Sequence, residues 1–519
     1  MLHVLCRDER SAGYMADAYA RVSGTVGVCE GPSGGGATYM LPGVVEANES
    51  SIPILAISTD IAVSARGKFT LTELDQTRLF APLTKWNSAI DRSADVPRLL
   101  RRAFVAMTTG RPGSVHLSLP FDVQKGEVDA ADVWAHATQA IYPARRTAPQ
   151  SDAVAEAARM LKSAHKALFI CGGGVISAHA EQALVALAER VGAGVATTIS
   201  GKGSIPEDHP LAVGVVGSNG GTPETRSIVA AADTIVFLGC RAGSVTTERW
   251  RYPRMGQAPI LHIDVDPAVI GANYKTDCVI VADAALALDA LLRECEGYVN
   301  PHMGELVEMI AAAKRAKFNT FIELSLSQAR PIRPERIVAA LRDCIPEDFI
   351  LVADAGTPCP YLSAYFELKK TGRQFITNRA HGALGYALSA AIGAQFARPQ
   401  SKVVAVMGDG SFGFTCGELE TALRHKLPIT FIVLSNATYG WIKAGQKTAF
   451  GGRYYGVDFS RTDHAAVGRA FGVESWTVEN PHEVEATIAR AIAHQGPSLV
   501  DIITQPLHEA HAPVSEWIA

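Results

Sequence analysis

The residues best suited to chemistry are an aspartate and an asparagine that each follow an apolar run. Gly408-Asp409-Gly410 follows residues 403–407, and Asn436 comes after 25 intervening residues, behind residues 428–434. Both runs are short and rich in β-branched residues, which predicts buried strands, with a turn at residues 408–410 and a helix over 418–425 between them. Ligands bind where the carboxyl ends of parallel strands meet. Carboxylate and amide oxygens suit Mg²⁺, which takes further ligands from phosphates, so the pattern predicts a metal-held diphosphate.

A second candidate carboxylate, Glu9, lies near the start of the chain. Residues 7–21 read RDERSAGYMADAYAR, and their spacing predicts a helix over 11–22. A carboxylate just before a helix can interact with the helix dipole as a cap. It can also serve in proton transfer if a ligand lies beside it. The residues alone leave both interpretations open.

Taken together, these segments resemble the thiamine diphosphate (ThDP) enzymes. The GDG-x25-N pattern and the Ala-Thr-Tyr-Gly that follows it resemble the metal and diphosphate signature of that family. Residues 7–21 resemble the RHEQ-x-A-x-x-M-A-x-G-Y-A-R stretch of its acetolactate synthase-like members, with Asp8 where the family usually has His. The resemblance implies that Asp409, Asn436 and the main-chain carbonyl of Thr438 hold Mg²⁺. It also implies that Glu9 is catalytic and exchanges a proton with the aminopyrimidine ring of the cofactor.

Three further loops extend the resemblance. Residues 30–38 resemble the family's TSGPGATN loop, and residues 354–358 and 379–385 resemble loops beside the diphosphate and the aminopyrimidine. Each segment also has a purely structural interpretation. Residues 30–38 could form an ordinary glycine-rich turn, Leu384 could belong to the hydrophobic core, and His381 could be a loop histidine without a ligand. Thr72 stands where relatives have a glutamine that faces the active site. The resemblance places the following residues at the cofactor: Ser33, Gly34, Gly35, Gly356, Thr357, His381, Gly382, Leu384, Gly408, Asp409, Gly410, Ser411, Asn436, Thr438, Tyr439 and Gly440.

The middle of the chain could hold a nucleotide. Residues 171–175 (CGGGV) follow an apolar run but do not satisfy the G-x-G-x-x-G dinucleotide fingerprint. Residues 200–203 and 262–267 resemble the middle domain of acetolactate synthases, which holds FAD in a non-catalytic role. Residues 239–243 keep only Gly239 and Arg241 of the flavin-binding pattern. FAD, ADP or no ligand therefore remain open for this domain.

The composition describes a well-packed α/β protein. The chain has 519 residues, 48% of them hydrophobic, a net charge of −4 and a pI of about 6.4. This balance does not favour a nucleic-acid partner or an anionic membrane. The nine cysteines are scattered without a CxxC pair, which is typical of reduced thiols in a cytoplasmic protein. No apolar run reaches the length of a membrane-spanning helix.

The elements that must position these residues form three blocks of alternating strands and helices. This alternation predicts parallel sheets with helices on both faces. By the resemblance, residues 1–140 form a pyrimidine-binding domain, residues 152–300 a central Rossmann-like domain and residues 335–510 a diphosphate-binding domain. Residues 1–6 read as a strand, and the first domain is predicted to lack about 40 residues at its front. A start codon assigned too late and a genuinely smaller domain are both open.

The resemblance predicts an enzyme that decarboxylates a 2-oxo acid and then joins the product to a second carbonyl compound. A 2-oxo acid decarboxylase and a 2-hydroxyacyl-CoA lyase are alternatives, and so is a catalytically silent homologue that serves as a partner subunit. An NAD-dependent dehydrogenase lacks its fingerprint. In this family the cofactor lies between two subunits, which implies a homodimer or a dimer of dimers with Glu9 and Asp409 supplied by different chains. The substrate is not predictable, because Asp8 and Thr72 depart from the family pattern.

Overall fold

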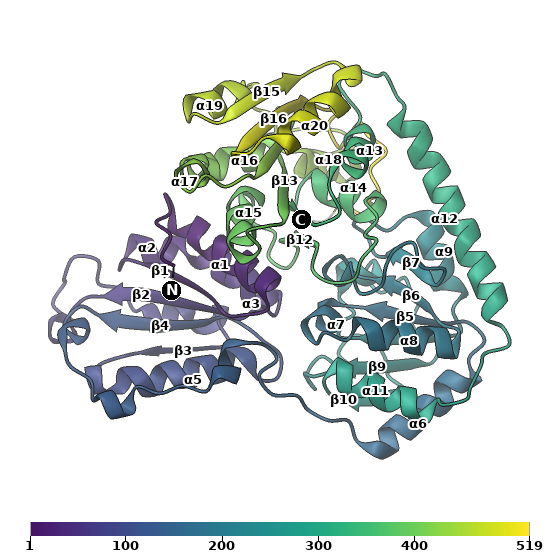
Figure 1. Cartoon of the computed structure of the whole chain (residues 1–519), viewed down its shortest axis with the longest axis horizontal. Coiled ribbons are helices and arrows are strands. Elements are labelled where there is room, and N and C mark those ends of the chain that lie inside the picture. The colour runs from purple at the N-terminus through teal and green to yellow at the C-terminus, as the bar shows by residue number, and fades with distance from the viewer. Residues whose placement is uncertain (1, 518–519) are drawn as a thin grey trace.

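Three parallel sheets organise the chain, one in each predicted block (Figure 1). The computed structural model describes residues 2–517. The apolar runs become strands, and the amphipathic segments between them become helices that cover the sheets. The α/β class with three parallel-sheet domains is therefore confirmed. The exact domain limits remain a prediction.

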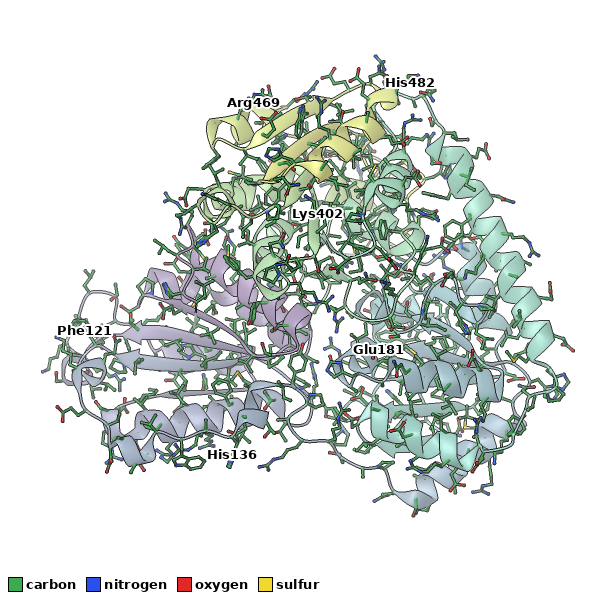
Figure 2. All side chains as sticks on the ribbon, viewed as in Figure 1. Phe121, His136, Glu181, Lys402, Arg469 and His482 are labelled. Atoms are coloured by element: carbon green, nitrogen blue, oxygen red, sulfur yellow. The ribbon has the colours of Figure 1, made fainter. Side chains whose placement is uncertain are left out.

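The first sheet has four strands in the order β1-β2-β4-β3, with all neighbours parallel. Phe121, which follows β4, marks the carboxyl edge of this sheet at the outer side of the domain (Figure 2). The elements of the domain are α1 (Glu9–Ser23), β1 (Gly27–Gly31), α2 (Gly35–Tyr39), α3 (Leu41–Glu49), β2 (Ile54–Asp60), α4 (Gln76–Phe80), β3 (Trp86–Ala89), α5 (Val96–Thr108) and β4 (Val115–Pro120).

The strand expected at the start of the chain is wrong. Residues 2–6 have no regular secondary structure, and Met1 lies outside the described residues. The reason is visible just beyond this segment. The backbone N–H groups of Arg7 and Asp8 donate to Oε1 of Glu418, at 2.9 and 3.1 Å, so they are satisfied by a side chain of the third domain rather than by a neighbouring strand.

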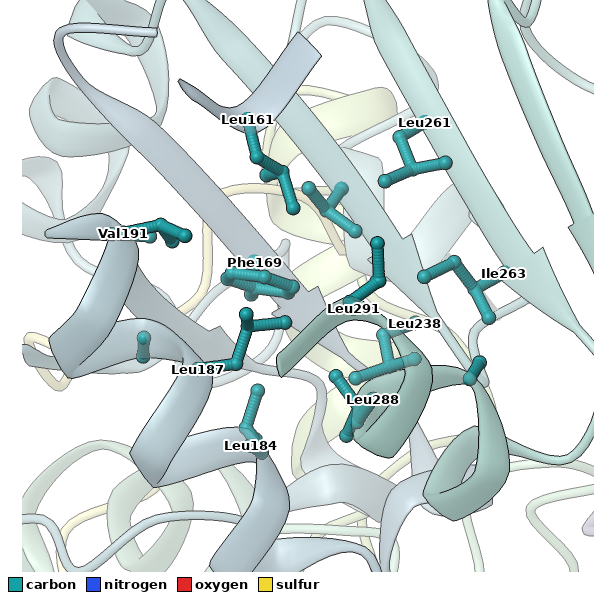
Figure 3. Packing of buried hydrophobic residues seen from close by; sticks show 14 of the residues in the cluster. Leu161, Phe169, Leu184, Leu187, Val191, Leu238, Leu261, Ile263, Leu288 and Leu291 are labelled. Carbon is teal, nitrogen blue, oxygen red and sulfur yellow. The ribbon is translucent and has the colours of Figure 1, made fainter. Parts of the chain in front are cut away.

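The middle sheet has six strands in the order β10-β9-β8-β5-β6-β7. Its core is a layer of leucine, isoleucine and phenylalanine side chains between the sheet and the helices α8 and α11, with Phe169, Leu187 and Leu288 among them (Figure 3). The elements are α6 (Ser151–Ser163), β5 (Ala167–Cys171), α7 (Gly173–Ser177), α8 (Glu181–Val191), β6 (Gly194–Thr197), β7 (Ala212–Val215), α9 (Pro223–Ala231), β8 (Thr234–Leu238), α10 (Ser244–Thr247), β9 (Ile260–Asp264), β10 (Cys278–Val281) and α11 (Ala284–Glu294).

The third sheet also has six strands, in the order β12-β11-β13-β14-β16-β15. The long helix α12 (Met303–Ser325) leads to it along the outer side of the molecule (Figure 1). The elements are α13 (Pro334–Cys344), β11 (Phe349–Ala353), α14 (Pro358–Tyr365), β12 (Phe375–Thr377), α15 (Tyr386–Ala397), β13 (Lys402–Gly408), α16 (Asp409–Thr415), α17 (Leu419–Arg424), β14 (Thr430–Ser435), α18 (Gly440–Ala449), α19 (His464–Ala470), β15 (Glu474–Val478), α20 (Val484–Ala493) and β16 (Ser498–Ile503).

Two features near the predicted metal site differ from expectation. The predicted turn at residues 408–410 is instead the start of α16, with Gly408 as its N-cap and Asp409 as its first residue. An acidic residue in the first turn suits the helix dipole, and this explains why the helix begins so early. The predicted helix over 418–425 is observed as a 3₁₀ turn at Cys416–Glu418 followed by α17.

The first and third domains meet through α1 and α15, which lie side by side at the centre of the molecule (Figure 1). The Tyr14 and Tyr386 rings pack edge to face with their centroids 5.3 Å apart. The helices approach so closely that a Cβ atom on Gly393 would lie 2.1 Å from the carbonyl oxygen of Met15. This contact brings the last turn of α1 to the carboxyl end of β12, where the Arg21 guanidinium donates to the carbonyl oxygen of Thr377 at 3.4 Å. None of the described helices combines the length and hydropathy that a membrane span requires.

Candidate cofactor site

Asp409 lies where β13 gives way to α16 and is almost fully buried. Its Oδ2 accepts the backbone N–H groups of Asn436 and Ala437, at 2.7 and 2.6 Å, and its Oδ1 accepts that of Gly410 at 2.8 Å. Burial raises the pKa of this carboxyl, while the three N–H donors act in the opposite direction. Asp409 thus ties the ends of β13 and β14 together, as the spacing predicted.

Asn436 presents an unused oxygen at the same edge. Its Oδ1 atom is buried and has no hydrogen-bond partner in the structure. A buried polar atom without a partner is costly, and a cation ligand would satisfy it. No group of three or more His, Cys, Asp or Glu side chains within residues 2–517 could hold a metal ion. A metal here would therefore rely on one carboxylate with amide and carbonyl oxygens, which is a donor set that suits Mg²⁺.

The glycines of the third domain divide into two kinds. A Cβ atom added to Gly356, Gly382 or Gly408 would meet no atom within 4 Å. A Cβ atom on Gly385 would instead lie 2.8 Å from Phe414, and one on Gly410 would lie 2.8 Å from the Tyr439 ring. The first three glycines therefore border open space, and the other two are required by packing.

Residues 378–385 connect β12 to α15 along the rim of this space. Gly385 has φ +87°, and its N–H donates to Ser411 Oγ at 3.1 Å. Asp354, at the end of β11, accepts the N–H of Ala387 in the first turn of α15 at 3.2 Å. These bonds fix the end of the loop to α16 and to the sheet, with His381 exposed and Leu384 half-buried.

The other predicted third-domain residues lie around the same edge. Thr357 is the buried N-cap of α14, and Thr438 donates its hydroxyl to the carbonyl oxygen of Val457 at 2.9 Å. Tyr439 and Gly440 lead into α18. Trp441, the next residue, packs against Trp517 with ring centroids 5.1 Å apart.

Glu9 is the first residue of α1, and Asp8 is its N-cap. The Asp8 carboxylate accepts the N–H of Arg10 at 2.8 Å, so Asp8 rather than Glu9 caps the helix. The Glu9 side chain turns toward the loop after β1: added Cβ atoms on Gly31 and Gly36 would each lie 3.2 Å from it. Glu9 is thus left available for a ligand beside this loop.

The predicted loop at residues 33–35 forms the first-domain wall. Gly34 has φ +69°, and a Cβ atom there would lie 2.9 Å from the Cβ atom of Thr72. The hydroxyl groups of Ser33 and Thr72 are hydrogen-bonded at 2.8 Å. Thr72 therefore lies against the candidate cofactor loop, while a Cβ atom on Gly35 would meet no atom within 4 Å.

The first and third domains also contact each other near the start of α1. Oε1 of Glu418, which follows α16, accepts the backbone N–H groups of Arg7 and Asp8, at 2.9 and 3.1 Å. The Arg10 guanidinium lies 5.6 Å from the centre of the Phe414 ring. The expectation that Glu9 and Asp409 of one site are supplied by different chains stays a prediction.

Comparison with known families decides the identity of this arrangement. Residues 1–79 match the N-terminal TPP binding domain of thiamine pyrophosphate enzymes, residues 154–291 match the central domain and residues 354–502 match the C-terminal TPP binding domain. The chain belongs to the thiamine pyrophosphate enzymes. The resemblance drawn from the motifs is confirmed. The open space beside Gly356, Gly382 and Gly408 suits a diphosphate, and the unpartnered Asn436 oxygen suits the metal that accompanies ThDP.

The relatives of this thiamine pyrophosphate enzyme are acetolactate synthases. It is 32% identical to a probable acetolactate synthase large subunit of Methanococcus aeolicus, over 98% of this chain and 86% of that protein. It is 30% identical to the acetolactate synthase isozyme 3 large subunit of Escherichia coli strain K12, over 94% of this chain and 85% of that protein. The chain is therefore an acetolactate synthase-like, ThDP-dependent enzyme that acts on carbon–carbon bonds.

This thiamine pyrophosphate enzyme has a separate cavity of about 470 Å³ in its middle domain. It lies at the carboxyl ends of β5, β8 and β9 and is bordered by Arg111 of the first domain and Arg379 of the third. Two of the three glycines at its floor are required by packing, because Cβ atoms on Gly172 and Gly174 would lie 2.0 and 2.7 Å from atoms of Gly239. The glycine run therefore does not by itself indicate a nucleotide.

Several charged residues of the site could not be found from motifs. Glu46, Asp17 and Arg21 are buried between the first and third domains of this thiamine pyrophosphate enzyme, and Glu418 is only 1% exposed. They are scattered on helices that read as ordinary amphipathic segments. The sequence carried only a weak signal of these residues. The helical spacing of α1 and α3 assigns some charged residues to the buried face, where a charge needs a partner.

Proposed function

We propose that this protein is a Mg²⁺- and ThDP-dependent enzyme that decarboxylates a 2-oxo acid and joins the product to a second carbonyl compound. The observation that carries the proposal is the buried Asp409 carboxylate beside the unpartnered Asn436 oxygen, at the ends of β13 and β14. Glu9, at the start of α1, supports the proposal as a carboxylate that the helix cap does not use. The acetolactate synthase names of the relatives support the carboligation step.

Mg²⁺ would be held by Asp409, Asn436 and the main-chain carbonyl of Thr438. The N–H groups of Asn436 and Ala437 already orient Oδ2 of Asp409, which leaves the remaining lone pairs of the carboxylate for the cation. A bound divalent cation would favour the ionised carboxylate and oppose the effect of its burial. The open space beside Gly356, Gly382 and Gly408 would receive the diphosphate.

Glu9 would be the proton-transfer group. When bound, ThDP supplies an electron sink for breaking and forming the bond next to a carbonyl carbon. Glu9 would hold a proton on its carboxyl group and pass it to and from the aminopyrimidine ring. Its neighbours Gly31 and Gly36 keep the carboxyl in a narrow space beside the β1 loop. Thr72 and Ser33 would border the substrate, and they are the residues to change when altering specificity.

Incubation with ThDP, Mg²⁺ and a series of 2-oxo acids tests the proposal. We expect CO₂ release together with a larger hydroxyketone-type or acetohydroxy acid product. CO₂ with an aldehyde would indicate a decarboxylase, and cleavage of a 2-hydroxyacyl-CoA would indicate a lyase. Cofactor binding without turnover of any of these compounds would contradict the proposal and favour a catalytically silent partner subunit.

Two finer proposals concern cofactor and location. The middle-domain cavity has room for a nucleotide, and FAD remains a proposal that the visible absorption spectrum of the purified protein tests. All nine cysteines are free thiols, which supports the predicted cytoplasmic location.

A further inference from the structure

A carboxylate of the first domain binds three consecutive backbone N–H groups of the third domain. Glu46, on α3, is fully buried. Its Oε1 lies 3.4 Å from the nitrogen of Ala380, and its Oε2 lies 2.8 and 3.3 Å from the nitrogens of His381 and Gly382. These nitrogens belong to the loop at residues 378–385, which carries the predicted cofactor residues His381, Gly382 and Leu384.

The same carboxylate is anchored on the first-domain side. Its Oε1 also accepts the Arg21 guanidinium at 3.2 Å and the Ser50 hydroxyl at 2.7 Å. Arg21 bonds the carboxylate of Asp17 at 2.8 Å, and Asp17 accepts the Tyr386 hydroxyl at 2.6 Å. Because Tyr386 begins α15, this buried chain of contacts also reaches the residue just beyond the loop.

A carboxylate is chemically required at this position. Gly382 has φ +79°, and successive N–H groups in such a loop form a concavity that favours an anion. Burial of a charge is tolerated only when it is paired and hydrogen-bonded, as Glu46 is. A glutamine of the same shape would keep one acceptor but would direct an NH₂ group at donors.

We propose that Glu46 is a positioning residue that fixes the 378–385 loop, at the predicted cofactor site of the third domain, to the first domain. It acts through the loop backbone and does not itself touch the cofactor. This inference rests on the proposed function, since the loop matters because it borders the ThDP site. Loss of the carboxylate loosens the loop and weakens ThDP binding while leaving the metal ligands in place.

Hydrogen–deuterium exchange of the full chain without cofactor tests the loop contact directly. In Glu46→Gln we expect the amides of residues 380–382 to exchange about tenfold to a hundredfold faster, since hydrogen bonds to a charged group are lost. Glu49→Gln is the matched control: Glu49 lies on the same helix but is half-exposed and contacts Arg241 of the middle domain. Exchange at residues 380–382 should not change in that control.

A ThDP titration with saturating Mg²⁺, followed by fluorescence, tests the consequence. We expect half-saturation at about tenfold or more higher ThDP in Glu46→Gln, with little change in Glu49→Gln. Glu46→Asp keeps the charge and should recover part of both properties, and it carries the test if Glu46→Gln does not fold. Unchanged exchange or unchanged half-saturation in a folded Glu46 variant would overturn the inference. If the wild type binds no ThDP, the proposed function fails, and the exchange data still decide whether Glu46 holds the loop.

Discussion

At the scale of single residues, the site rests on two carboxylates with opposite surroundings. Asp409 is buried and receives three backbone N–H groups, which is the setting of a fixed ligand. Glu9 opens α1 and is partly exposed, while Asp8 satisfies the helix cap in its place. The capping role of Asp8 frees Glu9 for proton transfer, and it gives a structural use to the residue that departs from the family pattern.

Glu9→Gln tests the proton-transfer role. The amide keeps the shape of the side chain but cannot exchange a proton at neutral pH, so we expect the rate of turnover to fall by about 10²–10⁴-fold. ThDP binding should change little. The measurement is steady-state CO₂ release, with Glu420→Gln as a control on a partly exposed carboxylate that pairs with Arg424. Turnover close to that of the wild type would refute the catalytic role.

At the scale of elements, the site is held by the junctions between strands and helices. Gly385 ends the cofactor loop with φ +87°, where its N–H and carbonyl groups bond Ser411 and Thr415. The helix α12 joins the middle and third domains and buries Lys317, whose ammonium group donates to the carbonyl oxygen of Ala364 at 3.1 Å. Both contacts carry measurable consequences for stability.

Gly385→Ala should destabilise the protein by about 2–4 kcal/mol. The cost combines a left-handed backbone with overlap against Phe414 and Thr415. Urea unfolding followed by tryptophan fluorescence measures it. Gly356→Ala is the control, because its added Cβ meets no atom within 4 Å; it should cost less than about 1 kcal/mol and should instead weaken ThDP binding. Equal stability losses in the two variants would contradict this account.

Stability should rise with pH in alkaline solution because of Lys317. Burial lowers the pKa of this ammonium group from 10.5 to about 8. Between these values the unfolded chain binds more protons than the folded chain, so the free energy of unfolding rises with pH, by on the order of 3 kcal/mol. Lys317→Met should remove the rise, and the exposed Lys275→Met should keep it. Urea unfolding curves recorded between about pH 7.5 and 10.5 measure how the free energy of unfolding changes with pH. An identical slope in Lys317→Met would count against this explanation.

Long elements, and the sheet edge that carries the predicted Mg²⁺ site, could be predicted from the sequence. Short strands and contacts between domains could not. Residues 403–407 and 428–434 were found because buried parallel strands are continuous apolar runs. The strand β3 (WNSA) was not predicted, since four residues with polar members carry no such signal. Glu46 was missed because the loop amides that it binds lie more than 300 residues away in the chain, and local periodicity does not report tertiary pairing.

At the scale of the whole molecule, part of the surface is apolar. Residues 439–459 expose several large hydrophobic side chains, with Phe450 56% and Tyr455 90% exposed. In the first domain, Phe69 and Leu71 are 100% and 88% exposed. Such surface often marks an interface. The homo-oligomer therefore remains a proposal, and these surfaces support it.

Sedimentation velocity tests the assembly. We expect a dimer or a dimer of dimers at micromolar concentration, and the double variant Phe450→Ser with Tyr455→Ser should shift it toward smaller species because apolar burial is lost. Phe121→Ser, at another exposed apolar site, is the control. An active monomer in the wild type would rule out the proposed homo-oligomer.

The most direct test of the central claim is a calorimetric titration of the protein with ThDP, carried out with Mg²⁺ and again after its removal with a chelator. The account predicts saturable binding of ThDP with Mg²⁺. Binding should be lost, or at least weakened by about a hundredfold, both without the metal and in Asp409→Ala with the metal present. Absence of ThDP binding by the wild type, or equal binding with and without Mg²⁺, would contradict it.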